Sequence, residues 1–462
     1  MRRHVLIANF LLASLALPVA PQTPERATLA ARIDSIVNAA IAARGAPGIA
    51  IAAVRGADTI ALKGYGLADV ENEVRVTDRG VFRIGSVTKQ FTAAAVMKLV
   101  EQGRVRLDAP LSEYLPDYPG PGGRVTIHQL LNHTSGIPSY TGMGPDFWSR
   151  SRLDLTHDEM LDLFARDSLE FEPGSRWEYN NSGYYLLGMV IEKVTGRPYD
   201  EHVRGELFEP FGLTQTLYCH QQPIVPHRVQ GYARDAGTLV NAALLSMNPP
   251  GAAGALCSTA RDLVRWTDAL IDGRVVNTQS FERMTTPTTL TTGETRSYGY
   301  GLTRERLGPH EVIQHGGGIN GFSAFLAWYP EQDLKIAVLA NGPTDAGAVQ
   351  ARIARAILGL PEPPPAVQPA EVPIDAATLA RYAGTYDLAP TIPIEVRIFT
   401  EGGRLMGQGT GQAAFPLLHV GEHTFLGPPQ SDIRIVFTIE NDRATSFTLH
   451  QGGRTTLARR IE

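Results

Sequence analysis

Apolar residues divide this chain into helical and extended segments. Several segments place apolar residues on one helical face, or form long apolar runs closed by glycine, and these patterns predict helices. The clearest runs from Val87 to Gln102 and is followed by Gly103. The expected helices cover residues 27–43, 87–102, 126–136, 156–194 with a break at 172–174, a segment opening at 258–262, and 348–358.

Short apolar runs bounded by turn residues alternate with these helices, which is typical of strands. Their short connections require antiparallel pairing. We therefore expect an α/β (α+β) fold, an antiparallel sheet flanked by helices, with a mostly helical subdomain between about residues 100 and 290. The expected strands cover residues 47–56, 59–64, 310–315, 321–329 and 334–340.

The pattern changes after a proline-rich stretch. Residues 27–358 are expected to form the main domain, and residues 359–374 predict an extended, semi-rigid linker. Beyond it, residues 375–462 combine a short helix near 376–382 with alternating strands, which predicts a small all-β, barrel-like domain. Its strands include residues 394–399, 433–438 and 444–449.

The first 22 residues have the pattern of a secretory signal peptide, with Arg2 and Arg3 before a short apolar core. We therefore expect a secreted or periplasmic protein. That core is too short to cross a bilayer comfortably, and no later segment is long enough without charges, so no stable membrane span is expected. Export would permit a disulfide between Cys219 and Cys257, and two unpaired, buried thiols fit the sequence equally well.

Composition narrows the function further. The chain has 462 residues, of which 43% are hydrophobic and 19% charged, as in a globular protein with a large core. A net charge of −5 without a long basic block argues against a nucleic-acid partner. His128 and His133 have no third ligand at metal spacing, so we expect them to pack or cap, with no metal and no cofactor. A small-molecule or peptide substrate is the expected partner, and the oligomeric state is left open.

The first candidate for chemistry is the pair Ser86 and Lys89, three residues apart at the start of the 87–102 helix. Residues three apart share a helix face, so the hydroxyl and the amine point the same way. A serine at a helix start also meets unpaired backbone N–H groups. A hydroxyl, an amine and free donors are the parts of an acyl-transfer centre, although the same two residues occur as a helix cap and a solvated lysine.

Two further motifs strengthen this candidate. Tyr179 and Asn181 form a Y-x-N motif at a loop-to-helix junction, and His315 opens a His-Gly-Gly-Gly run at the end of a strand. S-x-x-K, Y-x-N and H-x-G in this order resemble the serine β-lactamase and penicillin-binding-protein superfamily, and in particular the class C β-lactamase-related branch with its DD-peptidases, D-aminopeptidases and esterases. The resemblance covers residues 30–357 and extends to the phrases Leu131-Asn-His-Thr-Ser-Gly and Tyr298-Gly-Tyr-Gly.

The resemblance implies a covalent cycle in which Ser86 attacks a carbonyl carbon and water later releases the acyl group. Lys89 and Tyr179 would share the proton transfers. A neutral lysine at pH 7 needs a pKa fall of about 3 units and an ionised tyrosine a fall of similar size, so the two are treated as a coupled pair. Asn181 would hold the substrate amide and orient Lys89. The oxyanion hole would use the backbone N–H groups of Ser86 and Gly318.

The motif at His315 departs from the Lys-Thr-Gly of most lactamases. A free histidine titrates near ~6.5, so its charge is conditional, and Gly316 supplies no hydroxyl. Both changes weaken the grip on a carboxylate at neutral pH. Gly317 and Gly318 would let a substrate chain lie close to the strand edge. The same His-x-Gly pattern is found in peptidases and esterases of the family that the chain resembles, so a peptide or ester substrate is favoured over a β-lactam drug. The resemblance to D-aminopeptidases and DD-peptidases further implies a peptide containing D-amino acids.

Other enzyme classes find no support. The nearest G-x-S-x-G candidate, residues 321–325, lacks its second glycine, and the chain contains neither H-E-x-x-H nor a P-loop. The prediction is a secreted serine hydrolase that acts on amide or ester bonds through an acyl-Ser86 intermediate. The alternatives are a β-lactamase and a penicillin-binding or scaffold protein that is acylated without turnover.

Overall fold

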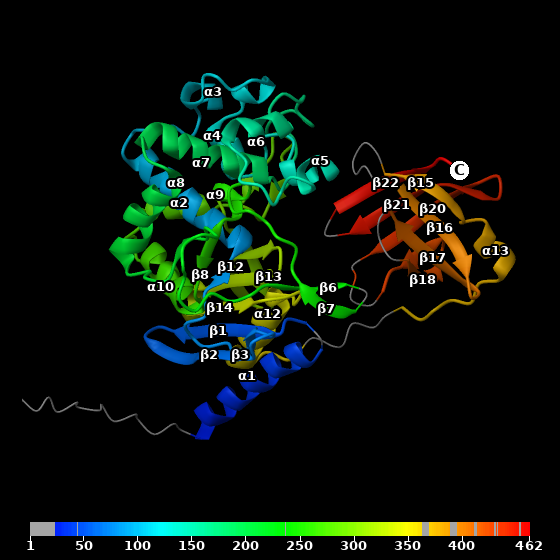
Figure 1. The fold of residues 1–462 in the computed structure, drawn as a ribbon, viewed down its shortest axis with the longest axis horizontal. Coiled ribbons are helices and arrows are strands. Elements are labelled where there is room, and N and C mark those ends of the chain that lie inside the picture. The colour runs from blue at the N-terminus through cyan, green and yellow to red at the C-terminus, as the bar shows by residue number, and fades with distance from the viewer. Residues whose placement is uncertain are drawn as a thin grey trace, which may run out of the picture.

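The computed structural model describes residues 24–43, 45–235, 237–362, 369–388, 395–410, 414–428, 431, 433–451 and 454–462. The predicted signal peptide, residues 1–22, lies outside the described residues, and so do residues 363–368 of the predicted linker. Figure 1 shows two units, a larger one built from a sheet and helices and a smaller β-barrel near the C-terminus.

A seven-stranded antiparallel sheet forms the centre of the larger unit, in the order β11-β12-β13-β14-β1-β2-β3. The N-terminal hairpin of β1 and β2 is inserted beside β14, the last strand of this unit, so the two ends of the unit meet in one sheet. The strands are β1 (Gly48–Arg55), β2 (Asp58–Asp69), β3 (Val74–Arg75), β11 (Thr303–Leu307), β12 (His310–Ile319), β13 (Phe322–Tyr329) and β14 (Leu334–Ala340).

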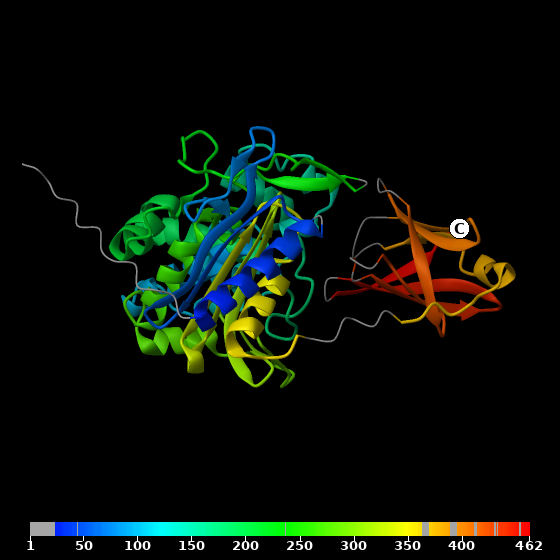
Figure 2. The same ribbon diagram turned by 90° about the horizontal axis from the view of Figure 1, so that it is seen from below.

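Both faces of the sheet are covered, which explains the unbroken apolar runs of its central strands. Ile49 and Ile51 of β1 point into a core shared with the helices α1 (Pro24–Ala42) and α12 (Ala346–Leu358). Ala50 and Ala52 point the other way, into the large core that contains the helix α10 (Ala260–Ile271). Figure 2 shows α1 and α12 side by side over one face.

A mostly helical layer covers the other side of the unit, in the upper left of Figure 1, as the sequence predicted. Its buried centre is α2 (Thr88–Glu101), preceded by the 3-10 turn η1 (Gly85–Val87). The surrounding helices are α3 (Leu111–Tyr114), α4 (Ile127–Leu131), α5 (Pro145–Trp148), α6 (His157–Phe164), α7 (Asn181–Thr195), α8 (Tyr199–Val203), α9 (Gly251–Gly254) and α11 (Thr278–Thr285).

A small sheet, β4-β8-β5, joins this layer to the start of η1. Its strands are β4 (Phe82–Arg83), β5 (Leu217–Tyr218) and β8 (Leu256–Ser258). A disulfide between Cys219 and Cys257 links the end of β5 to β8, which decides between the two states left open by the sequence. Short two-stranded sheets pair β6 (Tyr232–Asp235) with β7 (Thr238–Asn241) and β9 (Thr288–Thr289) with β10 (Thr295–Arg296).

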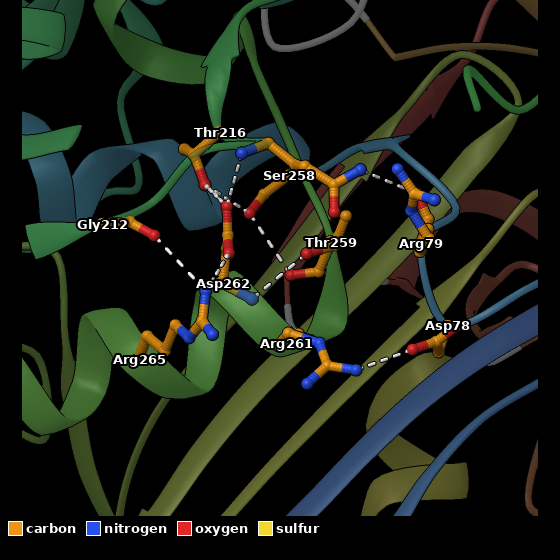
Figure 3. A network of polar contacts seen from close by, with 10 residues as sticks. Asp78, Arg79, Gly212, Thr216, Ser258, Thr259, Arg261, Asp262 and Arg265 are labelled. Atoms are coloured by element: carbon orange, nitrogen blue, oxygen red, sulfur yellow. Dashed lines mark hydrogen bonds and ion pairs between the residues drawn. The ribbon is translucent and has the colours of Figure 1, made fainter. Parts of the chain in front are cut away.

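A buried carboxylate fastens the loop before β5 to α10 (Figure 3). Asp262 is 1% exposed, and its Oδ2 accepts hydrogen bonds from the backbone N–H of Gln215 at 2.8 Å and the hydroxyl of Thr216 at 3.2 Å. The N-cap of α10 is Thr259, whose hydroxyl accepts from the backbone N–H of Asp262. The carboxylate of Asp262 is therefore free to bridge two segments.

Two of the expected helical segments have different boundaries in the structure. The helix expected over residues 126–136 starts at its Thr126 cap but ends at Leu131, because His133 adopts a positive φ of 64° that breaks it. The segment 156–194 contains two helices, and the extended stretch between Phe164 and Asn181 is far longer than the expected break. That stretch carries Tyr179.

The C-terminal unit is a closed eight-stranded antiparallel barrel, as the sequence predicted. Packed aromatic rings fill it: the ring of Phe437 lies 5.0 Å from that of Tyr382 and 5.4 Å from that of Phe447. Its elements are α13 (Ala376–Ala380), β15 (Gly384–Asp387), β16 (Glu395–Glu401), β17 (Arg404–Gly409), β18 (Phe415–Gly421), β19 (Thr424–Leu426), β20 (Arg434–Glu440), β21 (Arg443–Gln451) and β22 (Arg454–Arg460). In the described part of the chain, no helix has both the length and the apolarity of a membrane span.

Candidate active site

Ser86 and Lys89 lie where the sheet meets the helical layer. Ser86 is the middle residue of η1, and Lys89 is in the first turn of α2. The Nζ of Lys89 lies 3.2 Å from the Oγ of Ser86. The i, i+3 spacing therefore places the amine and the hydroxyl in contact.

The amine of Lys89 has two further partners, both from distant parts of the chain. Its Nζ donates to the side-chain Oδ1 of Asn181 at 2.8 Å and to the backbone carbonyl of Ala253 at 2.9 Å. Both partners are carbonyl oxygens, which only accept hydrogen bonds. A neutral amine has two N–H donors and one lone pair, so with both donors used the lone pair is left facing Ser86.

Burial favours this neutral form. Lys89 is 0% exposed, and desolvation alone lowers its pKa well below the usual 10.5. In the described part of the chain, no carboxylate forms an ion pair with it. Lys335 is a contrast: it is also buried, but hydrogen bonds to Asp333 and Asp268 outweigh its burial and leave its pKa raised.

Asn181 is held by both of its amide atoms. It is the first residue of α7, next to the N-cap Asn180, whose side chain accepts from the backbone N–H of Gly183. The Nδ2 of Asn181 donates to the hydroxyl of Thr141 at 3.1 Å, and its Oδ1 is the acceptor for Lys89. The predicted role of Asn181 in orienting Lys89 thus has a matching geometry.

Tyr179 lies in the same pocket, with its ring beside the amine of Lys89. Its ring is 4.7 Å from the Nζ of Lys89, so the amine faces the ring. Its hydroxyl lies close to Ser86, yet it completes no hydrogen bond with any described residue. Burial raises the pKa of Tyr179, with a small opposing effect from Ser86. The shifts of Lys89 and Tyr179 therefore favour a neutral amine beside a neutral phenol.

A cluster of aromatic rings packs around Tyr179. The ring of His133 packs 4.4 Å from that of Tyr179 and 4.6 Å from that of Tyr298. The Nδ1 of His133 accepts from the backbone N–H of Asn180, so this histidine packs and caps as predicted. Burial lowers its pKa well below 6.5.

His315 is buried in β12 and is held at both ring nitrogens. Its Nε2 is 2.9 Å from the hydroxyl of Tyr298, and its Nδ1 is 2.6 Å from the carbonyl of Gly316. Burial lowers its pKa to about 4. The sequence predicted a conditional charge near neutral pH. The structure corrects this, because a ring with a pKa of about 4 is neutral at pH 7.

The glycines of the H-x-G motif lie within β12, in the part of the strand nearest Ser86. Strand β11 pairs with β12 only up to Gln314, so beyond it η1 approaches this edge of β12. A Cβ at Gly317 would lie 2.0 Å from the carbonyl oxygen of Ile84, and one at Gly85 would lie 2.8 Å from that of Gly318. Only glycine permits this close approach of β12 to η1. The sequence analysis had linked these glycines to substrate access alone.

Three contributors to the site escaped the sequence analysis. Ala253 acts through a backbone carbonyl, and Thr141 holds Asn181 from a loop, so neither has a motif. Tyr298 belongs to the segment Tyr298-Gly-Tyr-Gly, to which the sequence gave no role.

A cavity of about 370 Å³ beside α9, lined by His157, Glu192 and others, contains none of the predicted site residues. Within the described residues, no group of three His, Cys, Asp or Glu side chains could hold a metal ion.

Comparison with known proteins assigns the chain to a family. Residues 33–360 match the family described as Beta-lactamase. The chain belongs to the β-lactamase family. The resemblance to the serine β-lactamase and penicillin-binding-protein superfamily is therefore confirmed, and with it the assignment to the serine hydrolases. Residues 368–459 match a Domain of unknown function (DUF3471).

Relatives within the β-lactamase family carry several names. The chain is 28% identical to penicillin-binding protein 4* of Bacillus subtilis, over 87% of this chain and 92% of the relative. It is 27% identical to a D-aminopeptidase of Gluconobacter oxydans, over 73% and 64% of the two chains. Among solved structures, the D-amino acid amidase of Ochrobactrum anthropi SV3 complexed with L-phenylalanine amide has a TM-score of 0.64 and 29% identity, covering 72% of this chain and 99% of that one.

The C-terminal barrel is also included in one structural match. The octameric penicillin-binding protein homologue from Pyrococcus abyssi is 26% identical with a TM-score of 0.64, and the match covers 93% of this chain and 99% of that chain. It therefore extends beyond the residues that match the Beta-lactamase family.

Proposed function

We propose that this protein is a secreted serine hydrolase that cleaves amide or ester bonds through an acyl-Ser86 intermediate, with peptides or amides of D-amino acids as its substrate class. The contact between the buried Lys89 amine and Ser86 carries this proposal. A general base must be within hydrogen-bond reach of the proton it takes and must be unprotonated near neutral pH. Lys89 meets the first condition by its 3.2 Å distance from Ser86, and burial shifts its pKa downward, the direction that the second condition requires.

In the first step, the Oγ of Ser86 attacks the substrate carbonyl carbon and its proton moves to the lone pair of Lys89. Asn181 and the carbonyl of Ala253 hold the two N–H groups of the amine, so the lone pair is directed before the substrate arrives. The tetrahedral intermediate collapses as the bond to the leaving group breaks. The leaving group departs with one proton.

Tyr179 is placed to deliver that proton. Its hydroxyl is neutral and makes no hydrogen bond with the described residues, so it is available to a substrate. The phenol donates to the departing nitrogen or oxygen, and the proton on Lys89 passes back to the phenol oxygen. A water molecule then attacks the acyl-enzyme by the same route in reverse, which restores Ser86.

The negative charge on the carbonyl oxygen needs backbone donors. The N–H groups of Ser86 and Gly318 are the proposed oxyanion hole, supported by the close contact of β12 with η1 at Gly85 and Gly317. Such donors contribute about 3–4 kcal/mol each to transition-state stabilisation.

Substrate preference follows from His315. A ring that is neutral above pH 4 offers no charge to a carboxylate beside Ser86. This supports amides and esters over β-lactam drugs. The names of the relatives, D-aminopeptidase and D-amino acid amidase, support D-amino acids as part of the substrate.

The Cys219–Cys257 disulfide supports export of the protein, because disulfides persist in oxidising compartments.

A substrate panel tests the proposal. Full-length protein and its Ser86→Ala variant are assayed with D- and L-aminoacyl amides, p-nitrophenyl esters and nitrocefin, and intact mass is recorded after each exposure. The expected result is turnover of a D-aminoacyl amide or an ester that disappears in Ser86→Ala.

Each rival has its own signature in the same panel. Nitrocefin hydrolysis without amide or ester turnover identifies a β-lactamase. A stable adduct on Ser86 without product release identifies a penicillin-binding protein that does not turn over. Turnover that persists in Ser86→Ala refutes the serine mechanism.

A further inference from the structure

A second cavity, of about 200 Å³, lies beside the strand that leads to Ser86. It is formed where β4, the Cys219–Cys257 disulfide and the start of β13 meet. Its polar lining consists of two arginines and three amide side chains: Arg83, Arg228, Gln221, Gln230 and Asn320. No aspartate or glutamate is among the described residues that line it.

Arg83 brings a charge into this cavity without a partner to neutralise it. Its guanidinium lies 5.9 Å from the centre of the Phe322 ring, and it forms no ion pair or hydrogen bond with the described residues. Burial, together with the charge of Arg228, lowers its pKa to about 10. A half-buried arginine facing a like charge is a destabilising arrangement.

Arg228 is fixed by hydrogen bonds that leave its charge uncompensated. Its Nη2 donates to the carbonyls of His220 at 2.7 Å and Pro223 at 3.2 Å, and its Nη1 donates to that of Gln221 at 3.3 Å. All three acceptors are neutral backbone oxygens. Its Nε is buried and finds no acceptor among the described residues. The side chain is therefore held in place while its charge stays unneutralised and one donor is unused.

The place of the cavity ties it to the active site. Arg83 precedes Ser86 by three residues, and Asn320 follows Gly318 by two. At about 3.3 Å per residue, the backbone of Arg83 lies within about 10 Å of that of Ser86. The same two segments that form the Ser86 site therefore continue into the wall of the cavity.

We propose that this cavity binds the anionic group of the molecule that acylates Ser86, a carboxylate or a phosphate bound by Arg83 and Arg228. Arginine forms paired, charge-assisted hydrogen bonds with both groups. The identity of the bound molecule as the substrate rests on the proposed function. Binding of an anion in the cavity does not depend on it. It separates two tasks: neutral His315 does not attract an anion beside Ser86, and the arginine pair does so in the neighbouring cavity.

The binding test uses the full-length Ser86→Ala protein, which cannot turn over. Succinate and inorganic phosphate are titrated by calorimetry at constant ionic strength, because salt screens exposed charges. The same titrations are made after adding Arg83→Gln or Arg228→Gln. Arg352→Gln is the matched control, since Arg352 is exposed and paired with Glu362 at 3.3 Å.

The expected result is saturable binding of at least one of the two anions that weakens tenfold or more in either cavity variant and is unchanged in Arg352→Gln. Whichever of succinate and phosphate binds more tightly identifies the group. Without anion, Arg83→Gln should not melt at a lower temperature than its parent, because it removes a repulsive charge and breaks no hydrogen bond with the described residues. Arg228→Gln also loses its hydrogen bonds to backbone carbonyls, so the Arg83→Gln titration decides the site if the two variants disagree. Binding that is absent, or equal in all variants, overturns the site.

The substrate arm compares two turned-over amides that differ only in a remote carboxylate or carboxamide. The parent enzyme should prefer the carboxylate in kcat/KM, and Arg83→Gln and Arg228→Gln should each lose that preference while keeping turnover of the carboxamide. Anion binding without such a preference refutes the link to substrate. If no Ser86-dependent turnover exists at all, the proposed function fails, and the titrations still decide whether the cavity binds anions.

Discussion

Lys89 provides a prediction that needs no substrate. If burial keeps its amine neutral in the folded protein, the folded state binds fewer protons than the unfolded state between its lowered pKa and the usual 10.5. Stability then rises with pH across that window. Replacing Lys89 by methionine removes the titrating group, so the advantage of the parent over Lys89→Met should grow as pH increases.

The size of the effect follows from linkage. Each pH unit at which the unfolded lysine is protonated and the folded one is neutral changes the free energy of unfolding by about 1.4 kcal/mol. For an amine already neutral at pH 8 in the folded protein, the unfolding free energy of the parent relative to Lys89→Met should rise by about 2.5 kcal/mol between pH 8 and pH 10. Tyrosine ionisation in the unfolded state affects both proteins alike and cancels.

Urea unfolding followed by tryptophan fluorescence measures this difference. All four tryptophans, residues 148, 177, 266 and 328, lie in the larger unit, so the signal reports that unit alone. Lys335→Met is the matched control. Lys335 is 3% exposed but has a raised pKa, so its stabilising contribution is fully present below 10.5 and is lost only above it. The parent should gain nothing over this control variant between pH 8 and pH 10.

Parallel stability curves for the parent and Lys89→Met would refute the reasoning. They would mean that Lys89 keeps its proton in the folded protein, so that it could not accept the proton of Ser86 at neutral pH. The proposed division of work between Lys89 and Tyr179 would then fail, although Ser86 could still be the nucleophile.

Three further changes test the architecture of the site. Gly317→Ala should lower turnover about 100-fold, because its Cβ would meet a backbone carbonyl oxygen at 2.0 Å and displace the strand, whereas Gly205→Ala, which meets nothing within 4 Å, should not. Asp262→Ala should lower the free energy of unfolding by about 2–4 kcal/mol, because it leaves two donors without their acceptor; an unchanged urea midpoint would contradict this. Replacing Cys219 and Cys257 together by serine should cost up to about 4 kcal/mol, since the disulfide closes a separation of 38 residues, and equal melting temperatures with and without reductant would show that it contributes nothing.

Local sequence pattern predicted most elements because their physical causes are local. The buried helix from Thr88 to Glu101 follows from an unbroken apolar run ended by Gly103, and the barrel strands follow from short alternating segments. Element ends were less certain. The helix after Thr126 ends early because His133 turns back to pack under Tyr179, a contact with a residue 46 positions away that no local pattern can reveal.

The electrostatic state of the site depends on such distant contacts. Sequence predicted that Lys89 and Tyr179 titrate as a pair and that His315 carries a conditional charge. The fold buries all three, which lowers the pKa values of Lys89 and His315 and raises that of Tyr179. Burial is a property of the packed chain, because it depends on which segments surround a side chain.

The sequence alone determined the family, the two kinds of structural unit, and the three motifs that carry Ser86, Asn181 and His315. Only the tertiary structure decided that the carbonyl of Ala253 completes the environment of Lys89 and that Cys219 and Cys257 are joined. It also decided that Arg83 and Arg228 line one cavity, with no carboxylate among the described residues of its lining. The reason is physical. Motifs record which side chains are present, whereas backbone acceptors, desolvation and unpaired charges exist only once remote segments have packed together.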